Sequence, residues 1–287
     1  MTDSSPAPHP AAKEKGDLSI TALYTSQTWS WGGLPCAELL ATPEAKVVFR
    51  LTNAALLFAR LMQKSPPSLR HSLLHRHTMI DRIVSDAGPS QVVELASGLS
   101  RRGASFSGDP ELRYVELDLP HVIAKKRELL GRTAEGEAVL ARPNLSLVAG
   151  DASTIEMSEL VDPGARLVVI AEGLLMYLTP DAQRQLWAKV RRAFDKARPG
   201  LFVFDLVPAC EQPPPGWVGR SLEAMMKRFT GGRSFERDER TRDDIARELR
   251  EAGFGRVEML EPRDVVQDWK LPYANTPTQQ LLFVCRP

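Results

Sequence analysis

Residues 91–118 read QVVELASGLSRRGASFSGDPELRYVELD, and this stretch decides the class of fold. It contains two short apolar runs, at 91–96 and 113–120, each bounded by small or polar residues. Short runs of this kind are typical of strands that are buried on both faces, as in parallel sheets. The stretch therefore predicts the first two strands of an α/β domain with helices on both faces of its sheet.

The same pattern continues toward the carboxyl end of the chain, where apolar runs alternate with amphipathic segments. Further strands are predicted at 145–151, within 166–178, and at 200–208, 255–260 and 279–285, and helices at 122–130, 179–195 and 241–254. This alternation indicates a parallel, Rossmann-like sheet. The last two strands follow each other without a helix between them, so we expect an antiparallel hairpin at the edge of the sheet.

Residues 17–90 lack this alternation and predict a helical cap on the sheet domain. Segments 36–63 and 68–87 carry apolar residues at helical spacing. The pair Thr42-Pro43 suits the start of a helix, because Thr is a good N-cap and Pro fits the first helical position. We therefore expect one helix to begin at Pro43 and another to cover the second segment.

Two segments fall outside both patterns. Residues 1–16 are rich in Pro, Ala, Ser and Lys and predict a disordered tail. Residues 209–240 interrupt the alternation and predict an insertion within an α/β domain that spans 91–287. Insertions that follow strand ends commonly build substrate pockets, so we expect this one to contribute to a pocket.

Composition excludes several classes of protein. The chain has 37 Lys and Arg against 36 Asp and Glu, a net charge of +1, which gives no general attraction to nucleic acid. It has no run of 18 apolar residues and no apolar stretch near its start, so we expect no membrane span, no secretory signal and a cytoplasmic location. Its three scattered cysteines predict neither a disulfide framework nor a zinc site.

Acidic and small residues gather where the predicted strands end. Ligands of open α/β sheets bind beyond the carboxyl ends of the strands, where the strand order reverses. Each acid alone can be a helix cap, but together they describe a nucleoside pocket without a strong pyrophosphate site, which favours S-adenosylmethionine over a dinucleotide. The strand-end residues are Glu94, Gly98, Asp118, Asp151, Ala152 and Glu172.

Three blocks of sequence resemble the leucine carboxyl methyltransferase-like family, which includes bacterial O-methyltransferases of polyketide and other secondary metabolism. They are VVELASGLSRRG at 92–103, YVELDLPHVIAKKRELL at 114–130 and LVVIAEGLLMYLTPDAQ at 167–183. The resemblance extends over about residues 20–287 and implies a class I S-adenosylmethionine-dependent methyltransferase fold.

The resemblance implies roles for five residues. Arg76 would hold the carboxylate of S-adenosylmethionine, and Gly98 would be the glycine of the first motif. Asp118 would bind the ribose, Asp151 would lie at the adenine, and Glu172 would lie near the methionine amino group.

The first motif departs from the family pattern. GAGLDTR of the family reads ASGLSRR at 96–102, so Ala96 replaces its first glycine and Ser100 its aspartate. Arg102 keeps the position of the family's arginine, and we expect it to serve the cofactor's carboxylate together with Arg76.

An aromatic segment lies in the predicted cap. Tyr24 and Trp29, together with Trp31 and Tyr177, would line a lid over the sulfonium, because a desolvated cation is attracted to aromatic faces. We therefore name Tyr24, Trp29 and Tyr177 as candidate catalytic residues. The alternative is that the tryptophans only pack the N-terminal segment onto the domain.

Histidines also cluster in the cap, in SLRHSLLHRHTM at 68–79. His71 and His75 share a helix face, but no third ligand follows, so we predict no metal. One of these histidines could act as a base, and the alternative is a structural histidine.

The favoured function is methyl transfer from S-adenosylmethionine to a carboxylate or hydroxyl of a small molecule. Some members of the bacterial subgroup resemble synthases that cyclise S-adenosylmethionine itself to azetidine-2-carboxylate, with release of methylthioadenosine, so the ligand would be methyl donor or substrate. A third hypothesis is a silent ligand-binding scaffold. An oxidoreductase is less favoured, because the glycine fingerprint is missing. The sequence leaves the oligomeric state open.

Overall fold

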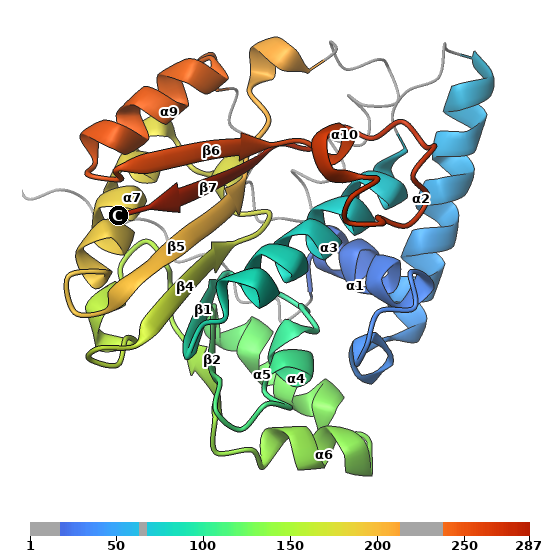
Figure 1. Cartoon of the computed structure of the whole chain (residues 1–287). Helices are drawn as coiled ribbons and strands as arrows, with labels where there is room; N and C mark the ends of the chain where they lie inside the picture. Colours follow the sequence, from blue (N-terminus) through green and yellow to red (C-terminus); the bar gives the residue numbers. More distant parts are fainter. Residues whose placement is uncertain (1–17, 63–67, 213–237) are drawn as a thin grey trace, which may run out of the picture.

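The computed structural model describes residues 18–62, 68–212 and 238–287. A central sheet is covered by helices, and the N-terminal helices lie at one end of it (Figure 1). The strands are β1 (Gln91–Leu95), β2 (Arg113–Asp118), β3 (Leu145–Ala149), β4 (Arg166–Ala171), β5 (Arg198–Asp205), β6 (Arg256–Leu260) and β7 (Leu282–Arg286). The helices are α1 (Ile20–Trp31), α2 (Pro43–Met62), α3 (Leu69–Ala87), α4 (Arg102–Phe106), α5 (Pro120–Leu130), α6 (Ala134–Leu140), α7 (Pro180–Ala193), α9 (Arg242–Glu251) and α10 (Pro262–Val265).

The order of strands in the sheet is β3-β2-β1-β4-β5-β7-β6. Strands β1 to β5 pair in parallel, whereas β7 is antiparallel to both β5 and β6. The predicted α/β class, the parallel sheet and the antiparallel closing pair are therefore confirmed. The order reverses between β1 and β4, which sets the position where a ligand of such a sheet binds.

Alternate residues of each strand point to opposite faces of the sheet, and each face has its own core. Val93 of β1 packs in a cluster with Trp187 of α7 and Leu249 of α9. Val92, its neighbour, packs instead with Met79 and Val84 of α3. Both sides of the strand are thus apolar, as the uninterrupted run VVEL predicts.

The cap contains α1, α2 and α3. Helix α2 begins at Pro43, and the Thr42 hydroxyl accepts the backbone N–H of Ala45 at 3.0 Å, so the predicted cap is confirmed. Helix α1 was not expected, because ITALYTSQTWSW has no clear apolar stripe. It begins with Ser19 as N-cap, whose hydroxyl accepts the N–H of Ala22 at 3.1 Å. Helices α4 and α6 are likewise short elements that the periodicity did not predict.

Two predictions lie outside the described residues: the tail at 1–16 and residues 213–237 of the insertion predicted at 209–240. The domain boundaries therefore stay predictions. In the part of the chain that is described, no helix is long and apolar enough to cross a membrane.

The turn after β1 contains a backbone conformation that suits glycine better than the residue present. Ala96 has φ +51°, the same value as Gly98 two residues later. A residue with a Cβ in this left-handed region costs about 1–2 kcal/mol. The family pattern has glycine at this position, so the departure seen in the sequence leaves local strain in the structure.

We expect Ala96→Gly to raise the free energy of unfolding by about 0.5–1 kcal/mol, because relief of strain exceeds the added entropy of the unfolded chain. Urea denaturation measures this change. Ala138→Gly, on an exposed position of α6, is the control and should instead lower the free energy of unfolding by about 0.5–1 kcal/mol. Equal losses in the two variants would contradict the strain at Ala96.

Candidate functional site

The carboxyl ends of β1, β2, β3 and β4 meet at one edge of the sheet, and the residues that follow them lie around the reversal of strand order. Helix α3 of the cap approaches the same edge and supplies two charged or polar side chains, Arg76 and His77, to Glu172 at the end of β4. The structure therefore brings residues from the cap and from the sheet into one buried cluster, which we call the acid cluster.

Glu172 is the centre of the acid cluster, and its side chain is only 7% exposed. Its carboxylate accepts hydrogen bonds from Arg76 Nε at 2.8 Å and His77 Nδ1 at 2.9 Å, and pairs with Arg102 Nη1 at 2.6 Å. Burial opposes ionisation, but the charges of Arg102 and Arg76 hold the pKa of Glu172 well below its ordinary value. This carboxylate is therefore fixed and ionised at neutral pH.

Arg102 lies behind Glu172 and is fully buried. Besides Glu172, its guanidinium donates to Asp81 at 2.6 Å, to Glu94 at 2.8 Å and to the His77 carbonyl at 3.1 Å. Each of its nitrogens therefore has a protein partner. In this arrangement Arg102 orients Glu172, and its predicted contact with the cofactor's carboxylate stays a prediction.

Glu94 is equally enclosed. Its second oxygen accepts the hydroxyl of Tyr114 on β2 at 2.9 Å, and only 1% of the residue is exposed. Asp81 of α3 also pairs with Arg101, the neighbour of Arg102. Asp81 and Tyr114 were not singled out in the sequence, because nothing local marks a helix acid or a strand tyrosine as a partner of Arg102.

Asp205 is a second residue that sequence reasoning missed. It ends β5 and is 1% exposed. One oxygen accepts Arg76 Nη1 at 2.8 Å and the other accepts the backbone N–H of Gly173 at 2.6 Å. The strand ends FVFD at 202–205, so the rule applied to the first four strand ends would have found it. Asp205 fixes both Arg76 and the turn after β4.

Asp118, the predicted ribose ligand, ends β2 and is half-buried. Its two oxygens accept the backbone N–H groups of Gly98 at 2.6 Å and Leu119 at 2.7 Å. Burial raises the pKa of this carboxyl. The side chain thus ties the turn after β1 to the end of β2, on the side of the sheet edge where a ribose is expected.

Asp151 and Ala152 follow β3. One oxygen of Asp151 accepts both the N–H and the hydroxyl of Ser153, at 2.8 and 2.7 Å. Ala152 is partly buried against the core that contains α7 and α9. Both therefore lie at the same edge as Asp118, where the adenine-side contact was predicted.

The three candidate aromatic residues occupy different surroundings. Tyr24 donates its hydroxyl to Asn53 of α2 at 3.2 Å and packs near Phe49, and burial raises its pKa to about 12. Trp29 stacks on the His77 ring with centroids 4.0 Å apart. Tyr177 is half-buried in a short 3-10 turn after β4, and burial raises its pKa.

Trp29 and Tyr177 are therefore close to the acid cluster, through His77 and the turn after Glu172, whereas Tyr24 packs inside the cap. The catalytic assignments stay predictions.

His71 and His75 have structural partners: the first bonds Ser68 at 2.6 Å, and the second bonds the Pro272 carbonyl at 2.5 Å. Within the described ranges, no group of three His, Cys, Asp or Glu residues is placed to hold a metal.

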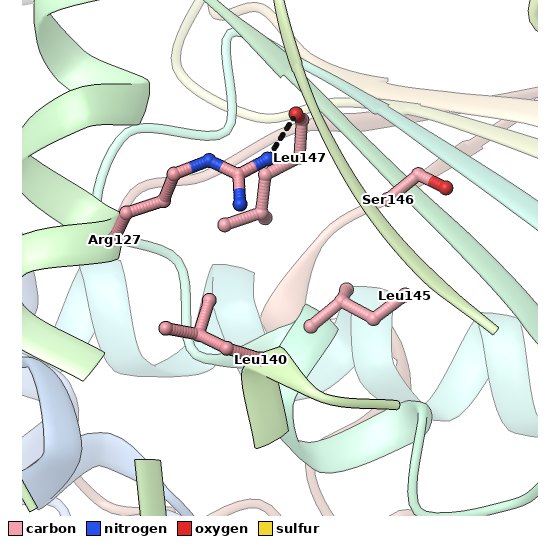
Figure 2. Close-up of a pocket in the computed structure, with 5 residues that line it drawn as sticks. All are labelled: Arg127, Leu140, Leu145, Ser146 and Leu147. Atoms are coloured by element: carbon pink, nitrogen blue, oxygen red, sulfur yellow. Dashed lines mark hydrogen bonds between the residues drawn. The ribbon is translucent and has the colours of Figure 1, made fainter. Parts of the chain in front are cut away.

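A separate pocket of about 300 Å³ lies beside edge strand β3, between this strand and helices α5 and α6. Figure 2 shows the Arg127 guanidinium bonded to the carbonyl of Leu147, at a distance of 2.9 Å. The other lining residues are Leu140, Leu145 and Ser146. The pocket shares no residue with the acid cluster, so we do not assign the reaction to it.

Comparison with known proteins agrees with this geometry. The leucine carboxyl methyltransferase family matches residues 35–191, more than half of the chain. The chain belongs to this family. The match includes α3 and strands β1 to β4, and so it covers every residue of the acid cluster except Asp205 at the end of β5.

Individual relatives match over shorter segments. A Mycobacteroides abscessus protein, assigned by inference as an S-adenosyl-L-methionine-dependent methyltransferase, is 37% identical over 119 residues, 41% of this chain and 38% of its own length. A Mycolicibacterium gilvum protein with the same inferred assignment is 41% identical over 101 residues, 35% of this chain and 33% of its own. The matched segments thus cover only 33–38% of the length of these curated relatives.

Solved structures are similar in fold. One is an inferred methyltransferase of Thermobifida fusca, with a TM-score of 0.55 and 18% identity over 96% of this chain and 97% of that one. Another is an inferred O-methyltransferase of Nostoc punctiforme, with a TM-score of 0.51 and 15% identity over 88% and 72%. At identities of 15% and 18%, this similarity shows that the chain has the same fold as these two structures.

We expect Asp205→Asn to lower the free energy of unfolding by about 2–4 kcal/mol, because it leaves the buried Arg76 with one fewer negative partner. Urea denaturation provides the measurement. Asp86→Asn removes an exposed carboxylate that pairs with Arg82, and this control should cost less than about 0.5 kcal/mol. Similar losses in the two variants would show that Asp205 does not anchor the acid cluster.

A second prediction concerns pH. Burial, together with the charge of Arg102, lowers the pKa of His77 to about 3. In the unfolded chain the pKa is about 6.5, so the unfolded state gains a proton as the pH falls below that value and the folded state does not. The stabilising contribution is complete above pH 6.5 and is lost progressively toward pH 3.

The stability advantage of the wild type over His77→Gln should therefore shrink by up to about 2 kcal/mol between pH 7 and pH 5. Urea denaturation of both proteins at pH 7, 6 and 5 tests this. If the free energy of unfolding changes equally with pH in the wild type and in His77→Gln, His77 is not held neutral in the folded protein.

Proposed function

We propose that this protein transfers a methyl group from S-adenosylmethionine to a carboxylate or hydroxyl of a small molecule. The observation that carries the proposal is the set of acids at the ends of β2, β3 and β4, around the reversal of strand order. This is where sheets of this type bind nucleoside ligands. Membership of the leucine carboxyl methyltransferase family supports the same reaction.

Asp118 is suited to the ribose. Each of its oxygens accepts one backbone N–H, and a carboxylate oxygen has a second lone pair for a further hydrogen bond. The two ribose hydroxyls would donate to these lone pairs. Asp151, at the end of the neighbouring strand, would then lie on the adenine side.

Arg76 and Glu172 are suited to the methionine end of the ligand. Nε and Nη1 of Arg76 bind Glu172 and Asp205. Nη2 of Arg76 lies 3.4 Å from where a side chain at Gly173 would begin, so a larger residue at this position would pack directly against this nitrogen. We assign the cofactor's carboxylate to Arg76 Nη2 and its ammonium group to the ionised Glu172.

Methyl transfer requires mainly that the protein position the two reactants. S-adenosylmethionine supplies an activated methyl group, so the protein must align the acceptor and exclude water. A carboxylate acceptor needs no base, and a hydroxyl acceptor must lose a proton. The cap would exclude water, with Trp29 and Tyr177 nearest the acid cluster. The family resemblance adds bacterial secondary metabolism as the setting, and the proposed location is the cytoplasm, as predicted from the sequence.

Product analysis tests the proposal. The protein is incubated with S-adenosylmethionine alone and with a pool of bacterial metabolites smaller than 1 kDa, and the nucleosides are identified by mass spectrometry. We expect S-adenosylhomocysteine, with a methyl ester or ether, only when the pool is present. If S-adenosylmethionine alone gives methylthioadenosine and azetidine-2-carboxylate, the proposal of methyl transfer is wrong and the protein catalyses cyclisation.

Binding is measured separately by calorimetry with S-adenosylhomocysteine. Asp118→Ala should weaken it by about 1.5–3 kcal/mol, since a charge-assisted hydrogen bond contributes about this much. Asp86→Ala, far along α3 on the exposed surface, should leave it unchanged. Unaltered affinity in Asp118→Ala would remove this residue from the ribose site, and binding without any turnover would favour the scaffold hypothesis.

A further inference from the structure

The segment between β1 and α4, residues 96–101, has a strained backbone, and we call it the β1–α4 turn. It is left-handed at both Ala96 and Gly98, and an alanine is strained in this conformation. Helix α4 follows directly, with no side chain of its own N-cap residue bonded to its free N–H groups. Under the proposed function the nucleoside lies against this turn. What holds the turn in shape therefore bears on binding.

Strand β2 holds the turn through side chains on one of its faces. Glu116 and Asp118 are two residues apart, so both point to the same side of the sheet. Asp118 accepts the N–H of Gly98. Glu116 accepts the N–H of Gly103, in α4, at 3.1 Å, and lies 3.5 Å from the hydroxyl of Ser97. The two carboxylates thus hold the β1–α4 turn from its start to the beginning of α4.

The contact between Glu116 and Gly103 leaves no room for a side chain at position 103. A Cβ there would overlap Glu116 Oε1. The backbone of α4 therefore lies directly against the carboxylate, which takes the place of the missing N-cap side chain. Because Glu116 is 1% exposed, this acceptor is enclosed by protein.

Lys126 of α5 neutralises Glu116. Its ammonium pairs with Glu116 Oε2, and the side chains of the two residues are 2% and 1% exposed. In the part of the chain that the structure describes, no other carboxylate pairs with Lys126. A buried charge that loses its partner is strongly destabilising, so each member of the pair depends on the other. Lys126 thus acts on the β1–α4 turn through Glu116.

Protonation of Glu116 would break this pair. Burial raises the pKa of Glu116 to about 7, although Lys126 opposes the rise. Glu94 of β1 raises this pKa further, and Tyr114 of β2 also lies near enough to interact with Glu116. The pair is therefore charged on both sides above pH 7 and loses its negative member below it.

We propose that Glu116 and Lys126 are a positioning pair for the cofactor. The ionised pair holds the β1–α4 turn in the shape that binds the nucleoside, and uptake of a proton by Glu116 loosens the turn. This inference rests on the proposed function, because it assigns the pair to the S-adenosylmethionine site. Both side chains are enclosed by protein, so they act on the affinity for the ligand through Gly98 and Asp118.

Calorimetry with S-adenosylhomocysteine at pH 8 and pH 6 tests the role of Glu116. The wild type should bind about fivefold more weakly at pH 6, as expected for one group with a pKa near 7 whose protonation weakens binding about tenfold. Glu116→Gln mimics the protonated acid, so it should bind about tenfold more weakly than the wild type at pH 8 and should change less than about twofold at pH 6. Glu128→Gln, an exposed position of α5, is the matched control and should keep the wild-type profile.

A double-mutant cycle at pH 8 tests Lys126. Lys126→Met alone should weaken binding about tenfold, because Glu116 without its cation takes up a proton. Added to Glu116→Gln, the same substitution should change the affinity less than about twofold, since Lys126 acts through Glu116. The double variant contains no unpaired buried charge, so it provides the comparison even where a single variant fails to fold. Lys125→Met, at the partly exposed neighbour, is the control and should leave the affinity unchanged.

Hydrogen exchange of the ligand-free protein separates this inference from the proposed function. At pH 8, peptides that cover residues 96–106 should exchange at least about threefold faster in Glu116→Gln than in the wild type, while those of β4 and β5 stay unchanged. Faster exchange in a protein whose wild type binds no S-adenosylhomocysteine would support the pair and contradict the proposed function. Unchanged exchange of residues 96–106, or a wild type and Glu116→Gln with the same affinity at both pH values, would overturn the proposal.

Discussion

The placement of the cap on the sheet depends on one buried carboxylate. Glu172 directly follows β4, and it is held by Arg76 and His77 of α3 and by Arg102 of the segment after β1. Three parts of the chain that are far apart in sequence therefore meet at a single ionised group. Removal of one partner from a buried charge costs several kcal/mol, so this cluster opposes displacement of the cap from the sheet in addition to the apolar packing of α3.

The acid cluster also carries a net negative charge. His77 is neutral because burial and Arg102 lower its pKa to about 3, which leaves three arginines against four carboxylates. These charged groups are Arg76, Arg101, Arg102, Asp81, Glu94, Glu172 and Asp205. The excess of one negative charge complements S-adenosylmethionine, whose sulfonium and ammonium groups outnumber its carboxylate by one. This balance supports the proposed ligand independently of any single contact.

The sequence predicts the sheet well because its strands are apolar on both faces, and that pattern is local. It also predicts which acids follow the strands, since Asp118, Asp151 and Glu172 lie at the sheet edge as expected. It could not predict that Arg102 is enclosed, because its partners come from α3 and β1. Helix α1 escaped prediction for a different reason: its residues are polar and aromatic without a clear stripe, and tertiary contacts such as the Trp29–His77 stack hold it in place.

The arrangement links ligand binding to the cap. An ammonium group near Glu172 competes with Arg76 and His77 for the same two oxygens, and both competitors belong to α3. A ligand that draws Glu172 toward itself must therefore weaken the hold on α3, whereas one that binds Arg76 and Glu172 together strengthens it. Under the proposed assignment a zwitterionic methionine moiety would do the second, because its carboxylate and ammonium groups would engage both partners at once. A cation without a carboxylate would engage only Glu172, so the pairing of Arg76 with Glu172 would discriminate against such ligands.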